Sequence, residues 1–163
     1  MDDNEAFIRK HYAGIYHYML VMLKDSAEAQ DAVQETFYRY LRMEKRFGSE
    51  EEARAYLYRA ALNVCKNIWR SNWFSKKVPV AEEGLLDRNN AAEEPDKEAA
   101  IDLIEAMKRI PVKYRDALHL YYYLGLSVSE IAALREKNEA TVRTWLLRGR
   151  KLLRKEMGDD YEI

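Results

Sequence analysis

The sequence predicts an all-α fold of two small helical domains joined by a flexible acidic linker. Its 163 residues include only three prolines and six glycines, and few segments show the alternation of a β-strand. The linker is expected over residues 78–98, where seven acidic residues stand against two basic ones and two prolines occur. The domains are therefore expected over residues 1–77 and 99–163, each large enough for a helical bundle.

The clearest local pattern of the amino-terminal domain predicts a helix over residues 25–41. Asp25 is placed to cap its first turn, and Glu28 completes a capping box. Apolar residues then recur at helical spacing and predict one buried stripe, made of Ala29, Val33, Phe37 and Tyr40 or Leu41. The opposite side would be a docking surface for another protein, although an ordinary solvated helix face explains it as well. That side carries Asp31, Gln34 and Glu35.

A second helix of this domain is expected from near Glu50 to about Ser71, behind a capping box made by Ser49 and Glu52. Residues 54–77 hold six basic residues and no acidic one, so one side of this helix forms a basic stripe. Aromatic rings are interleaved with the stripe, and rings beside cations suit unstacked bases better than a closed duplex. Burial in the core explains the rings equally well. The stripe consists of Arg59, Asn63, Lys66 and Arg70, and the rings belong to Tyr56, Tyr58, Trp69, Trp73 and Phe74.

Residues 127–154 have the layout of a DNA-reading helix-turn-helix. A short first helix begins at a capping box of Ser127 and Glu130, and Asn138 is suited to cap a second helix after the turn. Residues 135–155 hold eight basic residues against two acidic ones, which suits the phosphate-lined major groove better than a plain solvated face. In the second helix we expect Val142, Leu146, Gly149 and Leu153 to pack inward, and Arg143, Thr144, Arg148, Arg150, Lys151 and Arg154 to face a partner.

Two more helices are expected ahead of this motif. Helical pattern resumes near Ala99, and Pro111 opens a helix that ends at Leu124 and Gly125. The carboxy-terminal domain would therefore contain about four helices.

Composition and spacing argue against several other classes of protein. A single cysteine, Cys65, excludes an internal disulfide and is expected to be a buried apolar residue. His11, His17 and His119 lack metal-ligand partners at useful spacing, and no nucleophile–base pair or glycine-rich phosphate loop is present. No apolar run reaches 18 residues and no secretory leader is visible. We therefore expect a cytoplasmic protein without catalysis, metal, cofactor or membrane insertion.

In this order, the segments resemble the extracytoplasmic-function (ECF) group of bacterial sigma factors over nearly the whole chain. The resemblance implies that the first domain binds core RNA polymerase and the -10 promoter element, that the second binds the -35 element, and that the linker runs through the polymerase. It also implies an anti-sigma partner, with the protein monomeric when free or bound one-to-one to that partner. The matching residues are 25–41, Ala55 to Asn63, Ile110 with Pro111 and Arg115, and Ser129 to Arg150.

The resemblance also assigns candidate site residues. Docking to core polymerase falls on Asp31, Gln34, Glu35 and Phe37, where the family's common DLVQE reads DAVQE. Contacts to the melted -10 strand fall on Arg59, Asn63, Lys66, Asn67 and Arg70, although the usual acidic residue at position 67 is absent. The loop that accepts a flipped base consists of Arg46, Phe47, Gly48 and Ser49. The -35 element is assigned to Ser129, Thr141, Arg143, Thr144, Arg148, Arg150 and Lys151.

Two departures from the family lie in the helix-turn-helix. Where the family commonly has Leu-Gly-Ile, this chain has Arg135, Glu136 and Lys137, which removes the glycine that best tolerates a left-handed turn. Trp145 and Leu147 stand where many members carry Arg and His, so the family's base preference does not transfer.

The main alternative is a dimeric helix-turn-helix regulator that binds duplex operators and never contacts polymerase. Such a dimer needs a self-complementary apolar surface, and no heptad run is long enough to supply one. A structural helical protein is a further alternative, but it would leave both basic surfaces unexplained.

Overall fold

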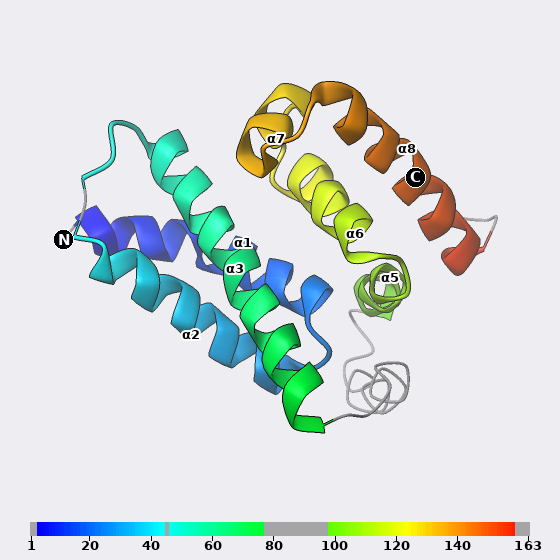
Figure 1. The fold of residues 1–163 in the computed structure, drawn as a ribbon, viewed down its shortest axis with the longest axis horizontal. Coiled ribbons are helices and arrows are strands. Elements are labelled where there is room, and N and C mark those ends of the chain that lie inside the picture. The colour runs from blue at the N-terminus through cyan, green and yellow to red at the C-terminus, as the bar shows by residue number, and fades with distance from the viewer. Residues whose placement is uncertain (1–2, 45, 77–97, 159–163) are drawn as a thin grey trace. The chain divides into compact units, whose positions relative to one another are not determined.

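The computed structural model describes residues 3–44, 46–76 and 98–158, and it separates into two compact units (Figure 1). Unit 1 comprises Met1–Val80 and unit 2 comprises Ala81–Ile163. The described residues form helices and turns and contain no strand, which confirms the predicted all-α class. The expected acidic linker lies outside the described residues, except that Glu98 begins a helix. None of the described helices is long and apolar enough to cross a membrane.

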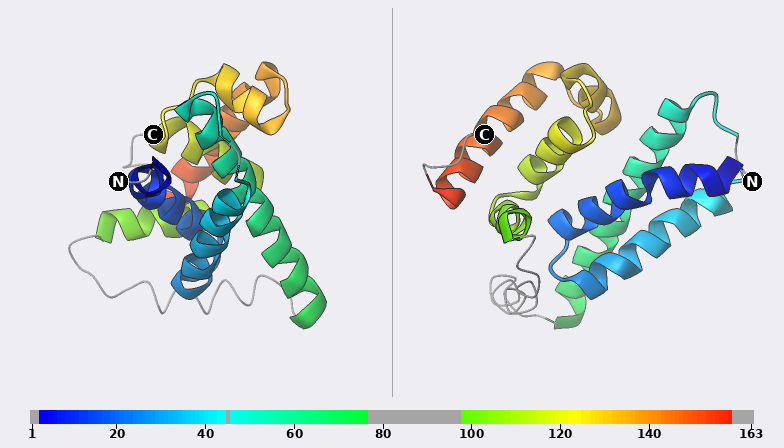
Figure 2. Two further views of the ribbon diagram at one scale, coloured as in Figure 1. Left: turned by 90° about the vertical axis from the view of Figure 1, so that its left-hand side faces the viewer. Right: turned by 180° about the vertical axis from the view of Figure 1, so that it is seen from behind.

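Unit 1 packs three helices against one another: α1 (Asp3–Met22), α2 (Ser26–Arg42) and α3 (Glu50–Lys76) (Figures 1 and 2). The predicted cap holds, because the side chain of Asp25 accepts a hydrogen bond from the Glu28 N–H at 2.7 Å. The Glu28 carboxylate accepts a hydrogen bond from Asn72 Nδ2 at 3.3 Å, which ties α2 to α3.

The core of unit 1 is apolar and includes buried aromatic rings. Tyr18 and Tyr58 are fully buried and meet edge to face, with ring centroids 5.5 Å apart. Cys65 is buried as predicted, and its Sγ lies 3.5 Å from Met19 Sδ. Helix α3 runs five residues beyond the predicted end near Ser71, because no glycine or proline interrupts residues 71–76.

Unit 2 contains α5 (Glu98–Lys108), α6 (Val112–Leu118), a π-helical turn η3 (His119–Tyr123), α7 (Val128–Arg135) and α8 (Glu139–Met157) (Figure 1). Pro111 precedes α6 as predicted, and Gly125 adopts a φ of 78° where the chain leaves η3. The helix expected from Pro111 to Leu124 is therefore present, but its last five residues form a wider π turn.

Gly149 allows α8 to lie very close to α6. A Cβ atom at this position would come within 3.1 Å of Leu118 Cδ1 and 3.2 Å of Tyr114 Cβ. Both neighbours are buried and have little room to move. The predicted inward stripe of Val142, Leu146, Gly149 and Leu153 is buried along its whole length.

Candidate nucleic-acid interface

The basic stripe of α3 is exposed on the side opposite the unit 1 core. Leu57, Ala61 and Val64 are buried, whereas the polar residues between them face outward. Arg70 Nη1 donates a hydrogen bond to Asn67 Oδ1 at 3.3 Å, so the amide and the guanidinium form one edge of the stripe. The five residues that the sequence assigned to the -10 strand share this exposed surface: Arg59, Asn63, Lys66, Asn67 and Arg70.

The aromatic rings of α3 divide into core and surface. Tyr58 is buried and belongs to the core, while Tyr56 and Trp69 are half-buried. Trp73 is 69% exposed, the highest exposure among the large hydrophobic residues that the structure describes. It follows Arg70 by three residues and so continues the three–four spacing of the stripe. The sequence indicated Trp73 only as one ring among several, and the side chain of Phe74 lies outside the described part.

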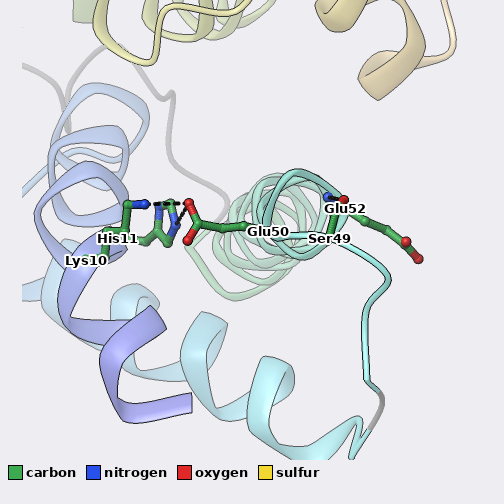
Figure 3. A network of polar contacts seen from close by, with 5 residues as sticks. All are labelled: Lys10, His11, Ser49, Glu50 and Glu52. Carbon is green, nitrogen blue, oxygen red and sulfur yellow. Dashed lines mark hydrogen bonds and ion pairs between the residues drawn. The ribbon is translucent and has the colours of Figure 1, made fainter. Parts of the chain in front are cut away.

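The loop before α3 is held by contacts at both of its ends. The Phe47 ring stacks on Tyr40 at 5.8 Å and lies against Tyr56 at 5.5 Å. At the helix start, Ser49 Oγ accepts the Glu52 N–H at 3.1 Å (Figure 3). Glu52 Oε2 in turn accepts the Gly48 N–H at 3.1 Å. Glu52 therefore fixes Gly48, and the loop leaves Arg46, Gly48 and Ser49 exposed.

A polar contact between α1 and α3 lies beside this loop. Lys10 Nζ donates a hydrogen bond to Glu50 Oε2 at 2.6 Å, and His11 Nε2 lies 3.9 Å from the same oxygen (Figure 3). The Lys10 hydrogen bond lowers the pKa of Glu50 below its usual value. Burial lowers the pKa of His11, an effect that the Glu50 carboxylate opposes and that Lys10 and Arg54 reinforce.

The candidate docking surface on α2 is present on the side that the sequence predicted. Asp31 and Gln34 are exposed, and Glu35 is paired with Arg39 at 3.1 Å. Phe37, by contrast, is 6% exposed and stacks on Tyr12 at 5.9 Å. Its ring supports α2 from inside unit 1, which confirms its predicted place in the buried stripe, and the role that the family resemblance assigns to it in docking stays a prediction.

The helix-turn-helix begins and turns where its local signals predicted. Ser127 and Glu130 form a complete capping box, and Asn138 Oδ1 accepts the Thr141 N–H at 2.8 Å. Between the helices, Glu136 adopts the left-handed conformation, with a φ of 56°. The turn therefore keeps a left-handed residue although the expected glycine is absent.

A buried ion pair fixes the first helix of this motif to α6. Arg135 Nε and Nη2 donate to the two oxygens of Asp116 at 2.8 and 2.7 Å, and the two side chains are only 7% and 6% exposed. Such a bidentate ion pair fixes both the position and the orientation of α7 relative to α6. This pair could not be predicted from the sequence, because Arg135 appeared only as a charge at the end of an apolar patch and its partner lies 19 residues earlier.

The outer surface of α8 carries most of the residues assigned to the -35 element. Arg143, Thr144, Arg148 and Lys151 are exposed, as is Ser129 on α7, while Thr141 is half-buried beside the cap. Arg150 lies on a flank, where its Nη1 donates to Tyr122 Oη at 3.1 Å. Arg143 lies 3.5 Å from Glu139 in an exposed ion pair. The described residues contain no cluster of three or more His, Cys, Asp or Glu side chains that could hold a metal ion.

Comparison with known proteins identifies the family that shares this arrangement of two helical units. Residues 7–75 match the family model of sigma-70 region 2, and residues 100–153 match that of sigma-70 region 4. The ECF RNA polymerase sigma factor SigL of Mycobacterium tuberculosis is 30% identical, over 94% of this chain and 89% of its own length. This chain belongs to the ECF sigma factors.

Other relatives extend the comparison. BldN of Streptomyces coelicolor, also an ECF sigma factor, is 28% identical over 90% of this chain, and the aligned part spans only 57% of BldN. SigV of Bacillus subtilis is 26% identical over 90% of this chain and 86% of its own length. The crystallised sigma factor RpoE of Bartonella quintana, in complex with the anti-sigma factor NepR, shares the fold with a TM-score of 0.74 at 16% identity, over 99% of this chain and 100% of RpoE.

Family membership decides between the alternatives left open by the sequence. ECF sigma factors are transcription initiation factors that direct RNA polymerase to promoters, so the two units correspond to region 2 and region 4 of one such factor. A dimeric operator-binding regulator is not favoured.

Proposed function

We propose that this sigma factor divides promoter recognition between its two units. The observation that carries the proposal is the presence of two exposed basic helix surfaces, on α3 and on α8, each backed by a buried apolar stripe in a separate unit. Phosphate contacts from these surfaces would supply most of the affinity, and contacts to base edges would supply the sequence preference.

Unit 1 recognises the -10 element as a melted strand. The stripe from Arg59 to Arg70 follows the phosphates, and the exposed indole of Trp73 offers a flat ring at its end. The loop from Arg46 to Ser49 receives a base that has left the stack, because three of its four residues are exposed while Phe47 anchors it to Tyr40.

Unit 2 recognises the -35 element as a duplex. Thr144, Arg148 and Lys151 lie on the exposed side of α8 and would enter the major groove, while Ser129 and Arg143 flank them. Thr141 and Arg150 are assigned to the edges of this contact, since both are partly covered.

Asp31, Gln34 and Glu35 on α2 dock unit 1 onto core polymerase. An anti-sigma factor binds the protein one-to-one; the support for such a partner is that RpoE, which shares the fold, was crystallised in complex with the anti-sigma factor NepR. The protein acts in the cytoplasm as a monomer and requires neither a catalytic site nor a cofactor.

The test is transcription from a promoter library by purified core polymerase, with and without this protein, at a fixed salt concentration. We expect protein-dependent transcripts whose start sites share two spaced upstream elements. Lys66→Ala should weaken use of the -10 element through the loss of a phosphate contact. Arg148→Ala should weaken use of the -35 element by on the order of 1–3 kcal/mol, the contribution of a base contact.

The same experiment can also contradict the proposal. Loss of the same element in both variants would show that the two surfaces are not divided as described. Absence of protein-dependent transcripts, together with tight binding to a palindromic duplex, would instead support an operator-binding regulator.

A further inference from the structure

One apolar side chain lies in the middle of the basic surface of α8. Leu147 is 48% exposed, three residues after Thr144 and four before Lys151, so it lies between them on the helix surface. It is not part of the buried stripe, which consists of Val142, Leu146, Gly149 and Leu153. A large aliphatic side chain is thus presented at the centre of the surface assigned to DNA.

The charges around Leu147 decide which partner this surface fits. Residues 140–155 include six basic residues and no acidic one. Arg143 and Lys151 lie one turn to either side of Leu147, and Arg148 is its neighbour in sequence. A polyanion is therefore favoured over an apolar protein surface, since packing against a protein would bury these cations without partners.

The major groove offers few apolar groups to such a side chain. Among the four bases, thymine alone presents a methyl group there, at C5, beside its O4 acceptor. Thr144 and Arg148 supply hydrogen-bonding groups next to Leu147, but Leu147 itself has only van der Waals contact to offer. The side chain and the thymine methyl are therefore complementary.

We propose that Leu147 contacts the 5-methyl group of a thymine in the -35 element and so fixes thymine at one position of that element. The proposal rests on the function proposed above, because it requires α8 to lie in the major groove of promoter DNA. It concerns a position at which this chain departs from the family, so it describes a preference of this factor in particular.

The experiment replaces thymines of the -35 element one at a time with uracil, which lacks only the methyl group. Promoters are first selected with holoenzyme formed from core polymerase and the full chain, and affinities are then measured at one salt concentration. We expect one replacement to weaken binding by about fourfold, the effect of losing one buried methyl group. At that position 5-methylcytosine should bind better than cytosine, because it restores the methyl group.

Two variants test whether Leu147 is responsible. Leu147→Ala should bind thymine and uracil promoters equally, whereas Leu152→Ala, at another exposed leucine of α8 that lies beside the buried stripe, should keep the fourfold difference. Leu147→Gln provides an independent check, since a glutamine can pair with adenine and should shift the selected base toward it. Circular dichroism of each variant establishes that α8 is folded.

Three results would overturn the proposal while leaving the proposed function intact. They are equal affinity for thymine and uracil at every position, a difference that persists in Leu147→Ala, and selected -35 elements that contain no thymine. Failure of the holoenzyme to select any two-element promoter would instead count against the proposed function itself.

Discussion

The two basic helices, α3 and α8, are built alike but differ in the apolar side chain that lies among their cations. On α3 it is the exposed indole of Trp73, and on α8 it is the exposed aliphatic chain of Leu147. A flat ring can stack on a base that has left the duplex, whereas a branched aliphatic group fits against methyl groups on a groove floor. If both surfaces bind DNA as proposed, charge would attract either form of DNA, and the exposed apolar side chain would select between a melted strand and a duplex.

The helices also differ in how their starts are fixed. Helix α3 is held near its start by the exposed contact between Lys10 and Glu50. Helix α8 packs directly on α6 at Gly149, and α7, which leads into α8, is fixed to α6 by the buried pair of Arg135 and Asp116. The -35 surface should therefore be far more sensitive to the loss of one ion pair than the -10 surface.

The largest expected effect comes from breaking that buried pair. Arg135→Ala leaves the Asp116 carboxylate buried without its cation, which should destabilise unit 2 by on the order of 3–5 kcal/mol. Binding to the -35 element should be lost while unit 1 stays folded. Urea unfolding can be followed through Trp145, which becomes the sole indole and hence a reporter of unit 2 when Trp69 and Trp73 are replaced by Phe.

The matched control is Arg143→Ala, which removes an exposed ion pair on α8. Its effect on the unfolding of unit 2 should be below about 1 kcal/mol, because exposed pairs are well screened by water. Similar unfolding midpoints for the Arg135 and Arg143 variants would show that the buried pair does not fix unit 2.

A smaller effect is expected at the exposed ring of α3. Trp73→Ala should weaken holoenzyme binding to a template with an unpaired -10 strand by about 1–3 kcal/mol, the usual contribution of one stacked base. Trp73→Phe should keep much of this affinity, since it retains a flat ring. Affinity for a -35 duplex should not change, and an equal loss on both templates would remove the distinction between the two helices.

The smallest expected effect is a dependence of stability on pH, and it should be confined to unit 1, which carries α3. Burial lowers the pKa of both His11 and His17, so the unfolded chain takes up protons at a higher pH than unit 1 does. This contribution to the stability of unit 1 is present above the unfolded histidine pKa of about 6.5 and is lost progressively as pH falls from that value through the lower pKa of each folded-state histidine.

Urea unfolding between pH 7.5 and 5.5, with Trp69 as the sole indole, should therefore show falling stability of unit 1. Glu50, Lys10 and Arg54 face His11, and the lowered pKa of Glu50 keeps its carboxylate charged throughout this range. The double variant His11→Gln, His17→Gln should have a flatter dependence on pH. An unchanged slope in that variant would assign the effect to other groups.

Features fixed within one helical turn were predictable from the sequence. The caps at Asp25, Ser127 and Asn138 depend on hydrogen bonds to a backbone N–H three residues later, so their chemistry is visible in a short segment. The buried stripes of α3 and α8 follow from helical spacing in the same way. The assignment of individual residues to DNA and polymerase remains a prediction.

Features that depend on distant partners were not predictable. In the sequence Arg135 looks like an ordinary charged residue at a turn, and its ion pair with Asp116 is visible only in the fold. Helical spacing predicted that Phe37 is buried, but it could not predict that Tyr12 from another helix stacks on its ring. The left-handed Glu136 also ran against local preference, because that conformation costs a residue with a side chain roughly 1–2 kcal/mol.

The contact between Arg135 and Asp116 also determines the smallest segment of this sigma factor that could be grafted onto another protein. A graft from Ser127 to Met157 would transfer both helices that face DNA, but it would separate Arg135 from Asp116. It would also place Gly149 against a foreign α6 that lacks the matching surface of Tyr114 and Leu118. Exchange of promoter specificity with a relative should therefore begin before α6, which makes α6 through α8 the module that can be moved between proteins.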